Sequence, residues 1–218
     1  MAFVTASLLV VSLALSAPVT LVSLFQPLPP QIAALSGTAR EGRAALSGGI
    51  ALTWRADWSG LVRGRLGADL VLVGPETRID ADAWAGLGGV GMSDAIGRAG
   101  PELLALFPEA ATCEGSAVVD IQTLRVSRAR YDVSGEIRTR AAICRGPGLG
   151  EVTVPPLLIA LGAVGDGAEA RVTSAAREPY AEALLTPDRR ARIRIEPAGA
   201  RLVPGLPSSE PIELELPF

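Results

Sequence analysis

The sequence predicts a mainly β protein: a transmembrane helix at the N-terminus, then an antiparallel sheet, curled or packed as a sandwich, with one or two short helices. Three observations support this fold class. Residues 1–39 carry no charge and begin with a long apolar run. Several later segments alternate apolar and charged residues with a period of two, which is typical of strands buried on one side only. Glycine and proline turn signals separate these segments.

The N-terminal run favours a membrane anchor. Residues 3–25 are predominantly apolar, which is long enough for a helix to cross a hydrocarbon core of about 30 Å, and Pro18 is tolerated in such a helix. The alternative is a cleaved signal peptide, but the run lacks a basic n-region, and its best cleavage site, at residues 14–16, would split the apolar core. We therefore expect a transmembrane anchor at residues 1–25 and a Pro-rich linker at residues 26–36.

Three segments show the strand pattern most clearly: LGADLVLVG from Leu66, ARIRIEP from Ala191 and IELELP from Ile212. Each places apolar side chains on one face. The other face is charged in the last two segments and carries Asp69 beside two valines in the first. One segment, MSDAIGRAGPELLALFPEA, departs from this pattern. Ser93 is a candidate N-cap there, so we predict one or two short helices in this segment, and a weaker one at residues 179–190.

These helices divide the body in two. We expect a first β set with a short helix at residues 37–110 and a second β set at residues 111–218. The second set contains both cysteines of the chain, Cys113 and Cys144. An even cysteine count beyond a membrane segment favours one structural disulfide over a pair of reduced buried thiols.

Composition excludes several functions. The chain has no histidine, which excludes a Ser-His-Asp triad and most zinc sites. The net charge of −3 is small and both signs are scattered, so we expect no nucleic-acid partner. Aromatic residues make up only 4% of the chain, which leaves few stacking platforms. We expect no catalytic residues, no cofactor and no metal.

Local motifs have structural explanations. The glycines of GLGGVG, at residues 86–91, lack the strand–turn–helix context and the lysine of a phosphate-binding loop. Asp80 and Asp82 fall on one strand face, where solvation explains them better than acid–base chemistry. Packing explains the three tryptophans better than a ligand platform does; these are Trp54, Trp58 and Trp84.

The first expected strands carry three motifs in this order: a G-[TV]-x-x-x-G-x-A strand, a strand ending in tryptophan, and an L-x-x-G-x-L strand ending near Gly-Pro. This order after an apolar anchor resembles the type II secretion system protein N family. The matching residues are Gly37, Thr38, Gly42, Ala44, Trp54, Leu61, Gly64, Leu66, Gly74 and Pro75. The later segments CEGSAVVDIQTLRVS and VSGEIRTRAAIC are similar as well.

The resemblance implies a non-enzymatic component of the type II secretion machinery, anchored once in the bacterial inner membrane with its body in the periplasm. Its partners would be the membrane and other inner-membrane subunits, contacted by strand addition at an open sheet edge, with no small-molecule substrate. The first basic residues, Arg40 and Arg43, follow the anchor, against the positive-inside rule, but the cysteine pair and the lack of a polybasic flank favour this topology.

The alternative is an envelope protein that handles or transfers lipid in a β groove. The two functions differ in the apolar sheet face, which is packed in the first and uncovered in the second. Because the apolar side chains are mostly small, we predict a closed, packed interior and an exposed strand edge.

Overall fold

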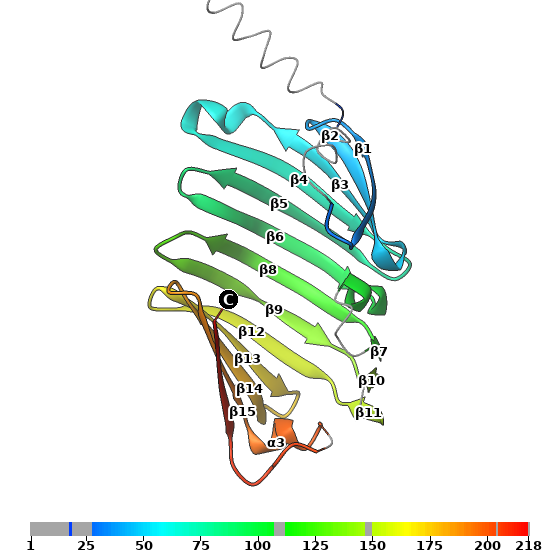
Figure 1. The fold of residues 1–218 in the computed structure, drawn as a ribbon, viewed down its shortest axis with the longest axis vertical. Coiled ribbons are helices and arrows are strands. Elements are labelled where there is room, and N and C mark those ends of the chain that lie inside the picture. Colours follow the sequence, from blue (N-terminus) through cyan, green and yellow to red (C-terminus); the bar gives the residue numbers. More distant parts are fainter. Residues whose placement is uncertain (1–17, 19–27, 107–111, 147–149, 204, 218) are drawn as a thin grey trace, which may run out of the picture.

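The computed structural model describes residue 18 and residues 28–106, 112–146, 150–203 and 205–217. Figure 1 shows that strands dominate and that the helices are short. The larger sheet has thirteen antiparallel strands. In spatial order they are β1 (Ile32–Gly37), β2 (Glu41–Leu46), β3 (Ala51–Asp57), β4 (Arg65–Val73), β5 (Arg78–Gly86), β6 (Gly89–Ala99), β8 (Ala117–Val126), β9 (Tyr131–Thr139), β12 (Leu157–Val164), β13 (Gly167–Ser174), β14 (Pro179–Thr186), β15 (Arg190–Ile195) and β16 (Ile212–Pro217).

The larger sheet is one continuous meander, in which strands that follow each other along the sheet also follow each other in the chain. It continues through the boundary predicted near residue 110, because β6 pairs with β8. Its first strand, β1, begins inside the segment predicted as a linker. In Figure 1 the blue strands and the orange-to-red strands turn out of the plane of the central strands, so the sheet is curled. Of the two predicted architectures, the curled antiparallel sheet is confirmed.

A smaller sheet consists of the remaining strands in the order β11 (Gly150–Val154), β10 (Ala142–Gly146) and β7 (Thr112–Glu114). It holds the predicted disulfide, since Cys113 and Cys144 are direct cross-strand partners with Cα atoms 4.0 Å apart. The disulfide therefore closes this small sheet and does not cross-link the large one.

The register of the large sheet separates two kinds of side chain. One row of paired residues takes one member from every strand and contains no polar side chain. We call it the apolar row: Leu35, Ala44, Leu52, Leu72, Ile79, Gly97, Val119, Ile137, Ile159, Val172, Ala181, Ile195 and Ile212. Successive side chains of a strand point to opposite faces, so this row defines one face of the sheet, the apolar face.

The adjacent row lies on the opposite face and is mainly polar. It runs through Ser36, Arg43, Thr53, Val71, Asp80, Ile96, Asp120, Glu136, Ala160, Arg171, Glu182, Arg194 and Glu213. Cross-strand ion pairs occur on this polar face, for example between Arg194 and Glu213. The sheet thus has one apolar and one wet face, as the alternation predicts.

No second layer of described residues covers the apolar face along its length. The buried hydrophobic residues are few, and Ile50 is the largest side chain that is fully buried. Most side chains of the apolar row are half-buried by their neighbours within the sheet. The prediction of a closed, packed interior is therefore wrong for the described part of the chain. Two packed sheet faces, as in a sandwich, would bury far more large side chains than the described residues do.

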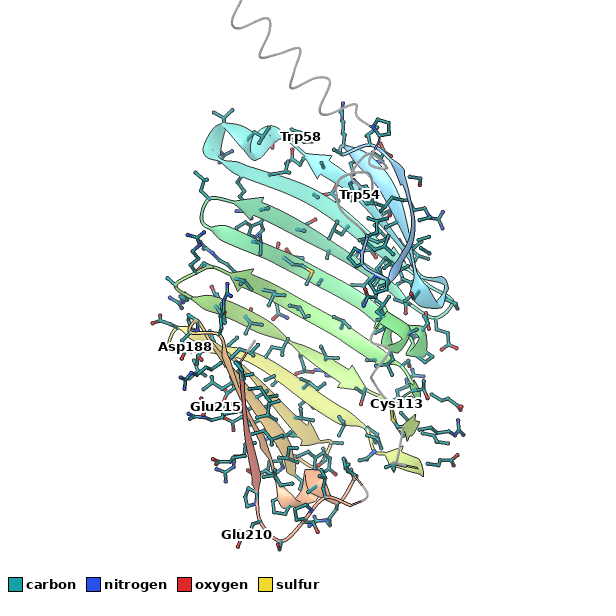
Figure 2. All side chains as sticks on the ribbon, viewed as in Figure 1. Trp54, Trp58, Cys113, Asp188, Glu210 and Glu215 are labelled. Carbon is teal, nitrogen blue, oxygen red and sulfur yellow. A yellow bond between two sulfur atoms is a disulfide. The ribbon has the colours of Figure 1, made fainter. Side chains whose placement is uncertain are left out.

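The two ends of the strands differ. At one end, which we call the covered end, lie the small sheet and the short helices η2 (Ser47–Gly49), η4 (Pro101–Leu106) and α3 (Pro197–Ala200). At the other end the strands are joined by short hairpins and by η3 (Ser59–Arg63). Figure 2 shows Cys113 near the covered end and Asp188 among the hairpins.

Hydrogen bonds fix η4 at the covered end. The Glu102 carboxylate accepts a hydrogen bond from the backbone N–H of Glu76, at 2.9 Å. The buried Thr77 hydroxyl accepts one from the N–H of Gly100, at 2.8 Å. Both contacts join the turn between β4 and β5 to the start of η4, so this helix is held against the sheet.

The predicted helices need two corrections. The segment from Ser93 to Ala99 belongs to β6, and among the residues of this segment that the structure describes, up to residue 106, only 101–106 are helical, as a 3-10 helix. Met92, Ala95 and Ala99 have the spacing of a helix face because β6 has one extra residue relative to β5. Ile96 strengthens the resemblance, although its side chain points to the opposite face of the sheet. Residues 179–186 form β14, in which Tyr180 and Leu184 add apolar side chains to the opposite face and hide the alternation.

Within the part of the chain that the structure describes, no helix is both long enough and apolar enough to cross a bilayer. The anchor predicted at residues 1–25 lies outside the described residues, except for Pro18. That residue forms an isolated antiparallel bridge with Thr38.

The disulfide generates a first prediction. Replacing Cys113 and Cys144 by alanine should lower the free energy of unfolding by about 3.5 kcal/mol, because the bond spans 31 residues and restricts the unfolded chain. Urea unfolding of the oxidised protein and the double variant measures the difference. Equal stability of the two proteins would contradict a structural role for the bond.

Candidate functional site: the apolar face of the large sheet

Two depressions of about 360 Å³ each lie on the apolar face. The first is near the hairpins and is lined by Leu66, Ala68, Ala83, Met92 and Leu124, among others. All of these side chains belong to the apolar face, as their cross-strand pairing shows. This depression crosses the middle strands β4, β5, β6 and β8.

The second depression lies at the covered end. Its walls are Leu103 and Leu104 of η4, the disulfide, and Ala117 and Leu157 at the starts of β8 and β12. Here the short helix and the small sheet stand beside the apolar face and close one end of it. The hairpin end carries no comparable cover among the described elements.

A strip of small and branched side chains connects the two depressions. It follows β6 and β8, where Ala95, Val119 and Ile121 lie between them on the apolar face. β6 has eleven residues, so the strip together with the two depressions is about 35 Å long at the usual rise of an extended strand. One leaflet of a bilayer is about 15 Å thick, so an extended acyl chain fits within the strip.

The chemistry of the strip is simple. Between the depressions its side chains are aliphatic, so the hydrophobic effect and dispersion act on a bound molecule there. The polar side chains in the linings lie in the depressions themselves: Trp84 in the first, and Ser116, Thr139 and Arg140 in the second. At about 25 cal/mol per Å² of apolar surface removed from water, covering this face is favourable for any apolar ligand. The arrangement can therefore bind hydrocarbon.

Most residues of the family pattern have structural roles away from the strip. The Trp54 ring lies on Gly42, where an added methyl group would be 2.3 Å from Cζ2, and the Trp54 Nε1–H donates to the Thr38 carbonyl. Ala44 is buried beside them and belongs to the apolar row. Gly37 has a positive φ at the turn between β1 and β2. The pattern thus defines the packing of the first three strands.

The remaining pattern residues lie on β4 and its flanks. Gly64 has a positive φ and ends η3, while Gly74 and Pro75 form the turn into β5. Leu66 lines the first depression, and Leu61 is exposed at the hairpin end. Leu66 is therefore the pattern residue that the structure places in the first depression.

Asp80 and Asp82, which the sequence places on one strand face, lie on the polar face of the large sheet. Asp80 pairs with Arg78 at 3.4 Å, and Asp82 lies opposite Asp69 on β4. Both are exposed, as predicted, and they point away from the apolar face. The glycines of residues 86–91 form the hairpin between β5 and β6. The described residues include no group of three or more cysteines or carboxylates placed to hold a metal ion.

Trp84 has contacts that the sequence does not reveal. The guanidinium groups of Arg65 and Arg125 lie 4.2 Å and 5.4 Å from the centre of its ring, as cation–π pairs. The three residues come from β4, β5 and β8, so no local spacing signals the cluster. It fixes two arginines close to the hairpin end of the polar face.

Three carboxyl groups have shifted pKa values. The pKa of Asp57 is lowered, mainly by a hydrogen bond from the backbone N–H of Ser59. The pKa of Glu182 is raised, mainly by a hydrogen bond with the Glu169 carboxyl on the polar face and also by burial. Burial by itself would raise the pKa of Glu102, but hydrogen bonds from the backbone N–H groups of Glu102 and Glu76 and from Thr77 outweigh it, so the pKa lies below 4.5.

No protein-family model, no curated protein and no solved structure matches this chain.

The lowered pKa of Glu102 generates a second prediction. A carboxyl whose pKa is lower in the folded state contributes stability above its unfolded pKa of about 4.5, and this contribution is lost as the pH falls through the folded pKa. The Glu102→Gln variant lacks this contribution. Between pH 6 and pH 3 the wild type should lose more thermal stability than the variant, with a difference in Tm on the order of 1–2 °C. Parallel pH profiles of the two proteins would contradict the role of Glu102.

Proposed function

We propose that this protein is a non-enzymatic envelope protein that binds lipid acyl chains along the apolar face of its large sheet. The observation that supports this proposal is the apolar row, which takes an apolar side chain or a glycine from all thirteen strands and lies on a face that no described layer covers. Single exposed hydrophobic residues are normal, but a continuous apolar surface of this kind marks a binding surface.

The form of the face favours hydrocarbon over a folded protein partner. A typical protein interface surrounds its apolar centre with a polar rim and contains about ten direct hydrogen bonds. The strip between the two depressions offers almost no side-chain donor or acceptor for such bonds. A flexible acyl chain needs no such partners. Its length also fits a strip that follows β6 and β8 from the hairpins to the disulfide.

This proposal generates a third prediction. Replacing Met92 by Glu places a charge in the first depression, so the purified protein should lose at least tenfold in affinity for a fluorescent fatty acid. Ile96→Glu is the matched control, because Ile96 lies on the same strand, is exposed and points to the polar face. Binding is measured by fluorescence titration after delipidation, and circular dichroism verifies the fold of each variant.

A second substitution tests the same site without a charge. Ala85→Trp fills the first depression with side-chain volume and should also reduce binding. Native mass spectrometry of the undelipidated wild type should show bound lipid. Equal affinity of the Met92→Glu and Ile96→Glu variants would rule out the apolar face as the lipid site.

The second candidate function is a role in the type II secretion machinery. The sequence pattern supports it, and so does the outer edge of β16, which pairs with β15 on one side and with no described strand on the other. On β16, Leu214 and Leu216 point to the apolar face while Glu213 and Glu215 point to the polar face. A strand that adds there would match best with arginines at alternate positions, as in β15.

In this proposal residues 1–25 anchor the protein in the inner membrane with the sheet in the periplasm, and subunits of the machinery contact the β16 edge. Lipid binding on the face and protein contact at the edge use different surfaces, so the two functions are compatible.

A fourth prediction tests the secretion role. A strain that lacks the gene should retain its type II exoproteins in the periplasm, and the wild-type gene should restore their release. The Glu213→Arg/Glu215→Arg variant should fail to restore it, because the added charges repel a basic partner strand. Glu41→Arg, which also breaks an exposed ion pair but on β2, is the matched control. Normal secretion by the deletion strain would refute this candidate.

A further inference from the structure

The hairpin end of the sheet presents hydrophobic side chains at the tips of its connections. Leu87, in the hairpin between β5 and β6, is 100% exposed, and Val62, in η3, is 97% exposed. Leu61, also in η3, is exposed as well. Glycines flank Leu87 on both sides, so no neighbouring side chain in the sequence shields it.

The same connections carry positive charge. Arg63 ends η3, and Arg128 and Arg130 lie in the hairpin between β8 and β9; all three are exposed. Among the described residues none of these arginines forms an ion pair, whereas Arg55 and Arg78 in the large sheet and Arg145 in the small sheet do. Asp57, the carboxylate nearest to η3 in sequence, is engaged by the N–H and hydroxyl of Ser59. We call the six residues Leu61, Val62, Arg63, Leu87, Arg128 and Arg130 the hairpin rim.

Contacts join these connections into one surface. A methyl group added to Gly64, which follows η3, would lie 3.6 Å from Leu87 Cδ1. A methyl group added to Gly88 would lie 3.6 Å from a guanidinium nitrogen of Arg125, which the Trp84 ring holds. η3 and the hairpin between β5 and β6 therefore lie side by side, with a fixed arginine behind them.

We infer that the hairpin rim docks on an anionic lipid bilayer and delivers acyl chains to the adjacent end of the apolar face. Exposed aliphatic tips next to unpaired arginines match a bilayer surface, where the aliphatic groups enter the acyl region and the arginines meet lipid phosphates. The first depression begins beside the rim, since Val90 and Val126 line it at the strand ends that join these hairpins. This inference rests on the proposed lipid-binding function and adds the route by which the lipid arrives.

The shape of the rim favours a membrane over a protein partner. The hydrophobic side chains stand on two separate connections, Leu61 and Val62 on η3 and Leu87 on the hairpin between β5 and β6, so they form no broad surface of the size that a stable protein interface needs. A bilayer requires no complementary surface, because each tip inserts independently. The opposite end of the strands is occupied by η4, α3 and the small sheet.

The test uses the full chain with a single fluorescent label. Both native cysteines are in the disulfide, so Leu87→Cys provides one free thiol for an environment-sensitive nitrobenzoxadiazole probe. Ser208→Cys is the matched label at the far end, two residues before Glu210, which Figure 2 places at the bottom of the molecule. Each labelled protein is mixed with vesicles of phosphatidylcholine, with or without phosphatidylglycerol.

The label at position 87 should shift to shorter wavelength and brighten several-fold with the anionic vesicles, while the label at position 208 should not change. The Arg63→Glu/Arg128→Glu/Arg130→Glu variant should lose the response, since each arginine near an anionic surface changes partitioning by about fivefold. This comparison keeps residues 1–25 intact, so attachment through that segment contributes equally to both proteins.

An unchanged spectrum at position 87, an equal response at position 208, or an equal response in the triple variant would overturn the inference. Its failure is distinguishable from failure of the proposed function. If fatty acid binds the apolar face while position 87 stays aqueous, only the docking surface is wrong. If position 87 responds as expected but Met92→Glu leaves fatty-acid binding unchanged, docking is supported and the acyl-chain site is wrong.

Discussion

The structure depends on the backbone hydrogen-bond ladder of its large sheet. In a globular domain a packed core holds the elements together, but here Ile50 is the largest fully buried side chain among the described residues. Thirteen strands are instead held by pairing with their neighbours, and the ladder satisfies their backbone groups strand by strand. Because the ladder organises the fold, no layer of described residues lies over one side of the sheet, and that side is the proposed binding surface.

The structure also depends on the register of its strands, because a slip of one residue would move all the apolar side chains of a strand to the polar face. β6 and β8 each contain one more residue than the strands outside them, and the ladder shifts there. Asp94 has a positive φ at this position in β6. The shift brings Met92 and Ala95, three residues apart, onto the same face. The irregularity therefore keeps the apolar face continuous between the two depressions.

The sequence predicts the local structure of regular strands well and that of irregular ones poorly. Simple alternation identifies β4, β15 and β16, and the cysteine count predicts the disulfide. The helix expected from Ser93 was wrong because a strand with an extra residue has the apolar spacing of a helix. No single strand distinguishes a curled sheet from a sandwich, because the same alternation of apolar and polar residues is expected in both. The Trp84 cluster depends on three strands and has no local signal.

The asymmetry of the two strand ends gives the apolar face a direction. At the covered end, η4 is fixed by Glu102 and Thr77, and the disulfide fixes the small sheet, so the second depression has rigid walls. At the hairpin end the connections are short, and Leu87 and Val62 are fully or almost fully exposed. A hydrocarbon chain that enters from the hairpins would end against η4 and the disulfide. Among the described residues the same ladder thus aligns an open end of the apolar face with a closed one, which is the arrangement that the proposed lipid-binding function needs.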